Sequence, residues 1–171
     1  PAVSTVNYNS DVKLSQALSL EGYTFDGWTT ADATIDNDSF KMPAKDVTLI
    51  GNFTKKDVVT VTFKLDGGTY QGETKDVVYK VYKNEGLKAN QTVPVPTKTG
   101  YTFKNFPGFK ANDTYAKDTV YTADWTINNY QVTYTVEQGI PYKGDLPAVS
   151  TVNYNSDVKL SQALSLEGYT F

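Results

Sequence analysis

The chain has 171 residues, of which 39% are hydrophobic and 13% aromatic, and its net charge at pH 7 is −3 with a pI near 4.9. The hydrophobic content is enough for one or two small hydrophobic cores. The net negative charge argues against a basic surface that binds nucleic acid, so we expect no nucleic-acid partner. The chain has no Cys and no His, which excludes disulfides and thiolate metal sites and removes the commonest general base. We therefore expect no enzyme and no cofactor. No run of about 18 apolar residues is present, so we expect no membrane insertion either.

A long exact repeat dominates the sequence. Residues 1–25 recur letter for letter as residues 147–171, an offset of 146 (147 − 1). Near-identical repeats in series are typical of extended surface proteins and rare in enzymes. We interpret the chain as a window cut from a tandem array.

A weaker repeat lies inside the first. The motif GYTF occurs at Gly22–Phe25, Gly100–Phe103 and Gly168–Phe171, so each 146-residue unit holds two related halves. The predicted division is residues 1–56 as the later part of one module, 57–127 as a complete module, and 128–171 as the earlier part of the next.

In chain order, the first predicted element is a short helix at Ser10–Leu20. Ser10 is an N-cap residue, Leu14, Ala17 and Leu18 follow helical spacing, and Gly22 is a stop signal. The aromatic pair Phe25 and Trp28 follows and is expected to fill the core. A strand is predicted at Val47–Phe53, and a four-residue linker at Thr54–Asp57.

The second half shows clearer strand signals. Apolar and polar residues alternate from Val59 to Leu65, which predicts a strand with one buried face. The Asp66–Gly68 turn and the run Asp76–Lys83 complete a predicted hairpin. Pro94 and Pro96 exclude a long helix before the second GYTF. After it we expect Phe103 and Phe106 in the core, a strand at Thr119–Thr126 and a linker at Ile127–Tyr130.

The last segment repeats the hairpin pattern. Val132, Tyr134 and Val136 alternate as Val61, Phe63 and Leu65 do, and a less regular return strand is predicted over residues 149–154. The predicted fold is mostly β (α+β), with strands, a hairpin and a crossover in a β-grasp-like order. Each unit then has two such modules, one with a short helix across its sheet.

These residues carry a family resemblance. GYTFDGW followed by MPAKDVTLIGNF resembles the Listeria-Bacteroides repeat, a β-grasp-like module also called the internalin B repeat, and the half with YTFKNF is similar to it. The half that opens with VTYTVEQGIPYKGDLP is also similar to the SHIRT-type stalk repeats of streptococcal adhesins. The chain departs from the usual motif where Asn105-Phe106 replaces Gly-Trp. The resemblance implies a tandem module of a wall-anchored or secreted bacterial surface protein, most typical of Gram-positive bacteria.

Three features suggest sites, each with a structural alternative. Asp32, Asp36 and Asp38 form an acidic loop that could bind Ca²⁺, although the glycine and Glu of an EF-hand are missing and a solvated turn explains the charges as well. Lys64 with Asn105 or Asn128 and Asp124 has the residue types of an isopeptide bond. A set of tyrosines suggests a sugar-stacking platform, whereas strand alternation explains most of them as core residues; the set is Tyr70, Tyr79, Tyr82, Tyr115, Tyr130 and Tyr142.

The function predicted from these patterns is a semi-rigid spacer in the stalk of a surface adhesin, exposed outside the cell. The alternative is a module that binds glycans or host proteins by avidity. The expected partners are neighbouring repeats of the same chain. Because residues 1–56 and 128–171 are complementary parts of one module, we also expect that they complete each other within one chain or head to tail between chains.

Overall fold

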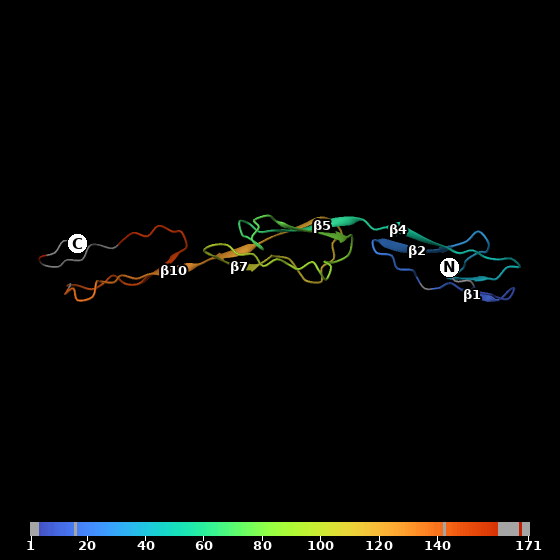
Figure 1. Ribbon diagram of the computed structural model, residues 1–171, viewed down its shortest axis with the longest axis horizontal. Coiled ribbons are helices and arrows are strands. Elements are labelled where there is room, and N and C mark those ends of the chain that lie inside the picture. The colour runs from blue at the N-terminus through green and yellow to red at the C-terminus, as the bar shows by residue number, and fades with distance from the viewer. Residues whose placement is uncertain (1–3, 16, 142, 161–167, 169–171) are drawn as a thin grey trace.

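The structure is elongated, and three groups of strands follow one another along its long axis in chain order (Figure 1). It is a computed structural model and describes residues 4–15, 17–141, 143–160 and 168. We name the groups the N-terminal module (residues 4–56), the middle module (57–127) and the C-terminal module (128–160). Within the described residues no helix has the length and hydropathy needed to cross a membrane.

The middle module is built around one central strand, β5 (Val58–Lys64). An antiparallel neighbour, β6 (Val77–Tyr82), lies on one edge, and a parallel neighbour, β8 (Thr119–Thr122), lies on the other. A second pair joins β7 (Tyr101–Asn105) to β9 (Asp124–Ile127), antiparallel. The predicted strand over Thr119–Thr126 is therefore split at Ala123, where the chain passes from one sheet to the other.

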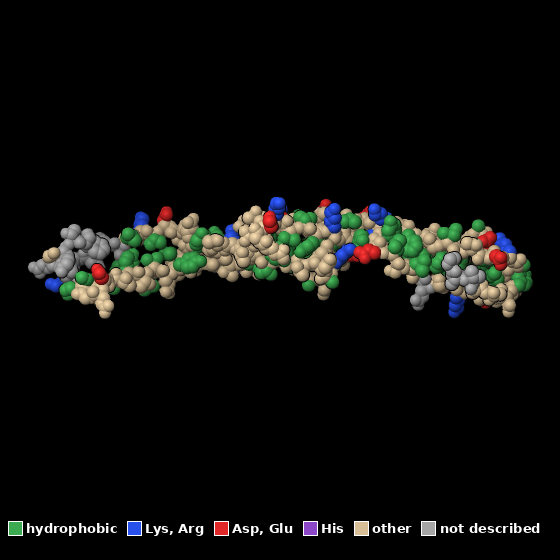
Figure 2. All heavy atoms as spheres, in the orientation of Figure 1, with side chains coloured by type: hydrophobic (Ala, Val, Ile, Leu, Met, Phe, Trp, Pro, Cys, Tyr) green, Lys and Arg blue, Asp and Glu red, His purple; other side chains and the backbone are tan. Residues whose placement is uncertain are grey.

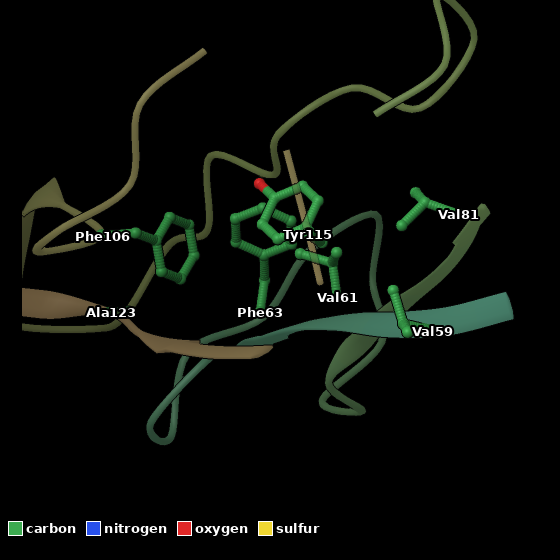
Figure 3. Close-up of a cluster of buried hydrophobic side chains, with 7 residues drawn as sticks. All are labelled: Val59, Val61, Phe63, Val81, Phe106, Tyr115 and Ala123. Atoms are coloured by element: carbon green, nitrogen blue, oxygen red, sulfur yellow. The ribbon is translucent and has the colours of Figure 1, made fainter. Parts of the chain in front are cut away.

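The predicted alternation along β5 is confirmed. Val61 and Phe63 are 0% exposed and Leu65 is 1% exposed, while the residues between them face outwards or to the side. Phe63 is the centre of the cluster, with Phe106 4.9 Å and Tyr121 5.6 Å away between ring centroids. Figure 3 shows the seven buried members of this cluster, namely Val59, Val61, Phe63, Val81, Phe106, Tyr115 and Ala123. Packing of this kind supplies most of a small module's stability.

The N-terminal module repeats the β7–β9 pair of the middle module. Its β2 (Tyr23–Thr29) and β4 (Ile50–Lys55) are antiparallel, with a bulge between Phe25 and Gly27 that matches the bulge between Phe103 and Asn105. The expected aromatic pairs form in both modules, but only the middle-module pair belongs to a buried core, because Phe25 and Trp28 are just half-buried. The ring centroid of Phe25 lies 5.5 Å from that of Trp28 and 5.2 Å from that of Phe53. In the middle module the ring centroid of Phe103 lies 5.2 Å from that of Phe106 and 5.5 Å from that of Trp125.

The predicted helix at Ser10–Leu20 was wrong. Asp11–Lys13 forms strand β1, which pairs with β3 (Ser39–Lys41), and the Leu14 N–H donates to the Asp38 carbonyl at 2.9 Å. The sequence Asp-Val-Lys-Leu-Ser also alternates with a period of two, and its serines favour helices only weakly. Tertiary pairing with β3 decides between the two patterns. Without this helix, the detailed β-grasp arrangement is not observed in the described residues, whereas the mostly β class is.

The C-terminal module contains a hairpin of β10 (Asn129–Val132) and β11 (Ser150–Asn153). The return strand β11 lies in the second copy of the duplicated sequence, and the same residues in the first copy, Ser4–Asn7, form no strand. Conversely, Asp11–Lys13 forms β1 in the first copy, while Asp157–Lys159 forms none. Each copy therefore adopts the part of the module for which a partner strand is present.

Replacing Phe63 should unfold the middle module selectively. We expect Phe63→Ala to lower its unfolding free energy by about 3–5 kcal/mol, because the substitution leaves a cavity in a fully buried site. Trp125 fluorescence in a Trp28→Phe background would report the denaturant midpoint of this module alone. The control is Val120→Ala, at an exposed position of β8. This substitution should change the unfolding free energy of the module by less than about 0.5 kcal/mol. Equal effects of the two substitutions would contradict the assignment of the core.

Candidate functional site at the module junctions

The junction between the middle and C-terminal modules is a single residue, Asn128, which lies between β9 and β10. Its N–H donates to the Gly100 carbonyl at 2.9 Å, and its carbonyl accepts the Tyr154 N–H at 2.8 Å. Its side-chain oxygen accepts the Thr102 hydroxyl at 2.7 Å. One residue is thus bonded to both modules, and the predicted four-residue linker at Ile127–Tyr130 is mostly strand.

At this junction the ring of Tyr154 packs directly against Gly100. A Cβ at Gly100 would lie 2.1 Å from the Tyr154 ring, so only glycine allows the ring to sit there, and the glycine φ of +76° favours the same residue. Tyr154 also contacts Tyr101 and Tyr130 edge-on, with ring centroids 6.0 and 6.4 Å apart. Its copy in the first repeat, Tyr8, is 73% exposed. The packing of Tyr154 thus depends on the glycine that the middle module supplies.

The junction between the N-terminal and middle modules has the same backbone plan. The Lys56 N–H donates to the Gly22 carbonyl at 2.8 Å, and the Lys83 N–H donates to the Asp57 carbonyl at 2.9 Å. Gly22 and Gly100 hold the same place in their GYTF motifs. The predicted linker Thr54–Asp57 is reduced to two residues, Lys56 and Asp57, because β4 ends at Lys55 and β5 begins at Val58.

Charged side chains reinforce the first junction, and Figure 2 shows acidic and basic groups side by side there. Lys88 pairs with Glu21 across the junction at 2.7 Å, and Lys56 pairs with Glu85. Both ammonium groups lie near the Tyr82 ring, with Lys88 Nζ 4.8 Å and Lys56 Nζ 5.6 Å from its centroid. A cleft of about 600 Å³ is bounded by these side chains and by Ala17–Tyr23.

The Glu21–Lys88 pair shifts both pKa values. The hydrogen bond from Lys88, and then its charge, lowers the pKa of Glu21 below its ordinary value of 4.5. The same hydrogen bond raises the pKa of Lys88 above 10.5. Both groups are exposed, so the pair guides orientation more than it adds stability.

The three acidic residues of the predicted calcium loop have separate roles in the structure. Asp32 pairs with Lys45 at 3.0 Å and accepts the Thr48 N–H at 3.1 Å; these bonds, the backbone one first, lower its pKa. Asp36 and Asp38 flank Asn37 in a tight turn, where Asn37 and Asp38 have positive φ and Asp36 exchanges backbone hydrogen bonds with Ser39. Among the described residues, no three acidic, His or Cys side chains gather as a metal site. Calcium binding stays a prediction without a built site.

The tyrosines of the predicted sugar platform are mostly packed within the modules. Tyr115 is 3% exposed, and Tyr79 donates its hydroxyl to the Thr92 carbonyl at 2.6 Å. Tyr70 and Tyr82 are half-buried, Tyr130 is 50% exposed, and Tyr142 lies outside the described residues. Of the five described tyrosines in the set, only Tyr130 faces solvent broadly.

Of the predicted isopeptide residues, Asn105 and Asp124 lie opposite each other in the β7–β9 pair, but among the described residues no hydrogen bond or ion pair joins the Lys64 side chain to either of them. Asp124 pairs with Lys104 at 3.4 Å, Asn128 is bound by Thr102, and the Lys64 side chain is exposed. The residues that form the junctions were not predicted from the sequence. The recurring glycine of GYTF carried that signal, because a glycine kept at the same place in each half points to close approach of a neighbouring group.

A methyl group at Gly100 should loosen the second junction. We expect Gly100→Ala to displace the Tyr154 ring and to raise the hydrogen-exchange rates of the Asn128 and Tyr154 amides about tenfold, as measured by NMR. The matched control is Gly108→Ala, because Gly108 has a similar φ of +81° but open space around its Cβ position. Both substitutions strain the backbone, so equal exchange at the junction would refute the packing role.

The pKa of Glu21 should depend on Lys88. A lowered carboxyl pKa means that the ion pair contributes fully above pH 4.5 and is lost as the pH falls through the folded-state pKa. In Lys88→Met we expect the Glu21 titration, followed by carboxyl ¹³C NMR, to return towards 4.5. Lys80→Met, at an exposed residue of β6, should leave the titration as in the parent chain. An unchanged Glu21 midpoint in Lys88→Met would show that the pair does not form in solution.

Two family models match successive parts of the chain. The model of the divergent InlB B-repeat domain matches residues 3–57, and that of the Listeria-Bacteroides repeat domain matches residues 60–128 and 130–171. The half that opens with VTYTVEQGIPYKGDLP thus matches these two models, and its similarity to SHIRT-type repeats stays a prediction. No solved structure matches the chain.

Three curated proteins are among its relatives. Internalin H of Listeria monocytogenes is 36% identical over 113 residues, which cover 64% of this chain and 19% of that protein. A putative Gly-rich membrane protein of Evansella cellulosilytica is 27% identical over 155 residues, 81% of this chain and 17% of its own length. A putative membrane protein of the same organism is 25% identical over 177 residues, which cover 96% of this chain and 25% of that protein. The chain thus spans a quarter or less of each relative. The family predicted from the GYTF motifs is confirmed: the chain belongs to the Listeria-Bacteroides repeat domain family.

Proposed function

We propose that the chain is a tandem structural repeat from the stalk of a bacterial cell-surface adhesin, where it acts as a semi-rigid spacer. The observation that carries the proposal is the junction at Asn128, where one residue is hydrogen-bonded to the module before it and to the module after it. A one-residue connection bonded on both sides leaves little freedom for bending. The elongated arrangement in Figure 1 is what such junctions produce when they follow one another.

The first junction supports the same role by other contacts. Its connection is two residues long, and the Glu21–Lys88 pair joins residues 67 positions apart in the chain across it. Two junctions of different side-chain chemistry with the same backbone plan indicate that the geometry between modules is the constant feature. A spacer requires this, because its length depends on that angle.

Location outside the cell is part of the proposal. One relative bears the name Internalin H and two are named as membrane proteins, so a surface-exposed array, wall-anchored or secreted, fits these names best. The organism class we propose is Gram-positive. No catalytic step belongs to the proposal.

The rival function, glycan or host-protein binding by avidity, has less support. Four of the five described tyrosines of the predicted platform are half-buried or buried, and a flat aromatic surface needs several exposed rings together. The spacer is therefore the function that the geometry supports best.

Scattering from arrays of different length would test the spacer. We expect the maximum dimension, measured by small-angle X-ray scattering on one, two and three 146-residue periods, to grow linearly with the number of periods. The control array carries a Gly/Ser insertion of about six residues after each Asn128 or its equivalent, which should shorten the average extension because the linker becomes a flexible coil. If the parent array and the control scatter alike, the junctions are not rigid and the spacer proposal fails.

A further inference from the structure

The first junction has a longer connection and looser aromatic packing than the second. Two residues, Lys56 and Asp57, form the connection, whereas one residue does so at the second junction. A Cβ at Gly22 would lie 3.0 Å from the hydroxyl oxygen of Tyr82 and 3.5 Å from its nearest ring atom. The corresponding distance to the aromatic ring at the second junction is 2.1 Å. Backbone and ring packing therefore restrain the first junction less than the second.

Charged side chains supply further contacts at the first junction (Figure 2). Lys88 of the middle module pairs with Glu21 of the N-terminal module at 2.7 Å. Lys56 of the connection pairs with Glu85, and the ammonium groups of both lysines lie within 5.6 Å of the centre of the Tyr82 ring. We call these five residues the junction cluster. It joins the end of one module, the connection and the start of the next module.

The second junction has no such cluster. The strand registers and the recurring GYTF motif align the two junctions residue by residue. Four of the five members of the junction cluster have neutral counterparts, with Thr99 in place of Glu21, Asn128 of Lys56, Asn153 of Tyr82 and Ser156 of Glu85. Only Lys88 has a charged counterpart, Lys159, and within the described residues no ion pair crosses the second junction.

The two kinds of contact differ in their response to salt. The side chains of Glu21 and Lys88 are 76% and 43% exposed, so dissolved ions reach the pair. The screening length falls from about 8 Å at physiological ionic strength to about 3 Å at molar salt, which weakens attraction between exposed charges. At the second junction, the hydrogen bonds of Asn128 and the contact of Tyr154 with Tyr101 involve no charged group. Salt should therefore loosen one junction and leave the other unchanged.

We propose that the first junction is a salt-sensitive hinge and the second junction a fixed connection. At low ionic strength the junction cluster keeps the N-terminal and middle modules at one angle. At high ionic strength the cluster separates, and the two-residue connection lets this angle vary. The middle and C-terminal modules move as one unit under both conditions. The inference deepens the spacer proposal and rests on it, because it identifies the joint that makes the spacer semi-rigid.

Spin labels on either side of each junction test the hinge, and the absence of Cys allows labels to be placed at chosen sites. Thr24→Cys with Val120→Cys spans the first junction, and Val120→Cys with Thr151→Cys spans the second; all three sites are exposed strand positions. When NaCl is raised from about 0.05 M to about 1 M, we expect double electron–electron resonance to show the distance distribution broadening about twofold across the first junction only. Equal broadening at both junctions, or none at the first, would overturn the proposal.

Substitutions in the labelled chains separate the ion pair from general packing. Lys88→Met should broaden the distribution across the first junction at low salt as much as high salt does in the parent chain. The control is Lys104→Met, which removes an exposed pair with Asp124 inside the middle module and should change neither distribution. Exchanging the charges, with Glu21→Lys and Lys88→Glu together, should restore the narrow distribution at low salt. A distribution that stays broad after this exchange would overturn the proposal.

The hinge and the spacer can fail separately in these measurements. Broad distributions across both junctions at low salt would contradict both proposals. Narrow distributions that do not change with salt would contradict only the hinge, and the spacer would then be stiff under all conditions.

Discussion

The central strand β5 is the interaction on which the structure depends. It pairs on both edges and buries Val61, Phe63 and Leu65 completely, so it supplies hydrogen bonds and core at the same time. In the part of the chain that the structure describes, only the middle module has a strand paired on both edges.

The duplicated sequence shows how far neighbours decide local structure. Ser150–Asn153 is a strand and Ser4–Asn7 is not, although the letters are the same, because only the former lies beside β10. Tyr154 packs on Gly100 while Tyr8 faces solvent. In the duplicated residues, strand formation thus depends on whether a partner strand lies alongside, and the intrinsic β-propensity of the residues decides little.

This explains what the sequence could and could not predict. The strand over Val59–Leu65 and the aromatic packing around Phe25 and Phe103 were predictable, because strict alternation and repeated motifs are local signals. The predicted helix at Ser10–Leu20 was wrong because the segment satisfies both periods and its partner residues in β3 lie 26 to 30 positions away in the chain. The junction contacts were not predictable, because the hydrogen bonds of Asn128 depend on where the backbone lies in the folded chain. The only sequence signal for them was the glycine of GYTF.

The topology of the middle module also determines how it responds to mechanical tension. A pull along the array enters at the start of β5 and leaves at the end of β9, and β8 leads into β9 through Ala123. Because β5 and β8 are parallel, the pull slides them past each other in opposite directions. The ladder from Val61 to Lys64 is then loaded in shear, so its hydrogen bonds have to break together and not one after another. A module held in this way resists extension more strongly than one whose bonds open singly, which would suit the spacer that we propose.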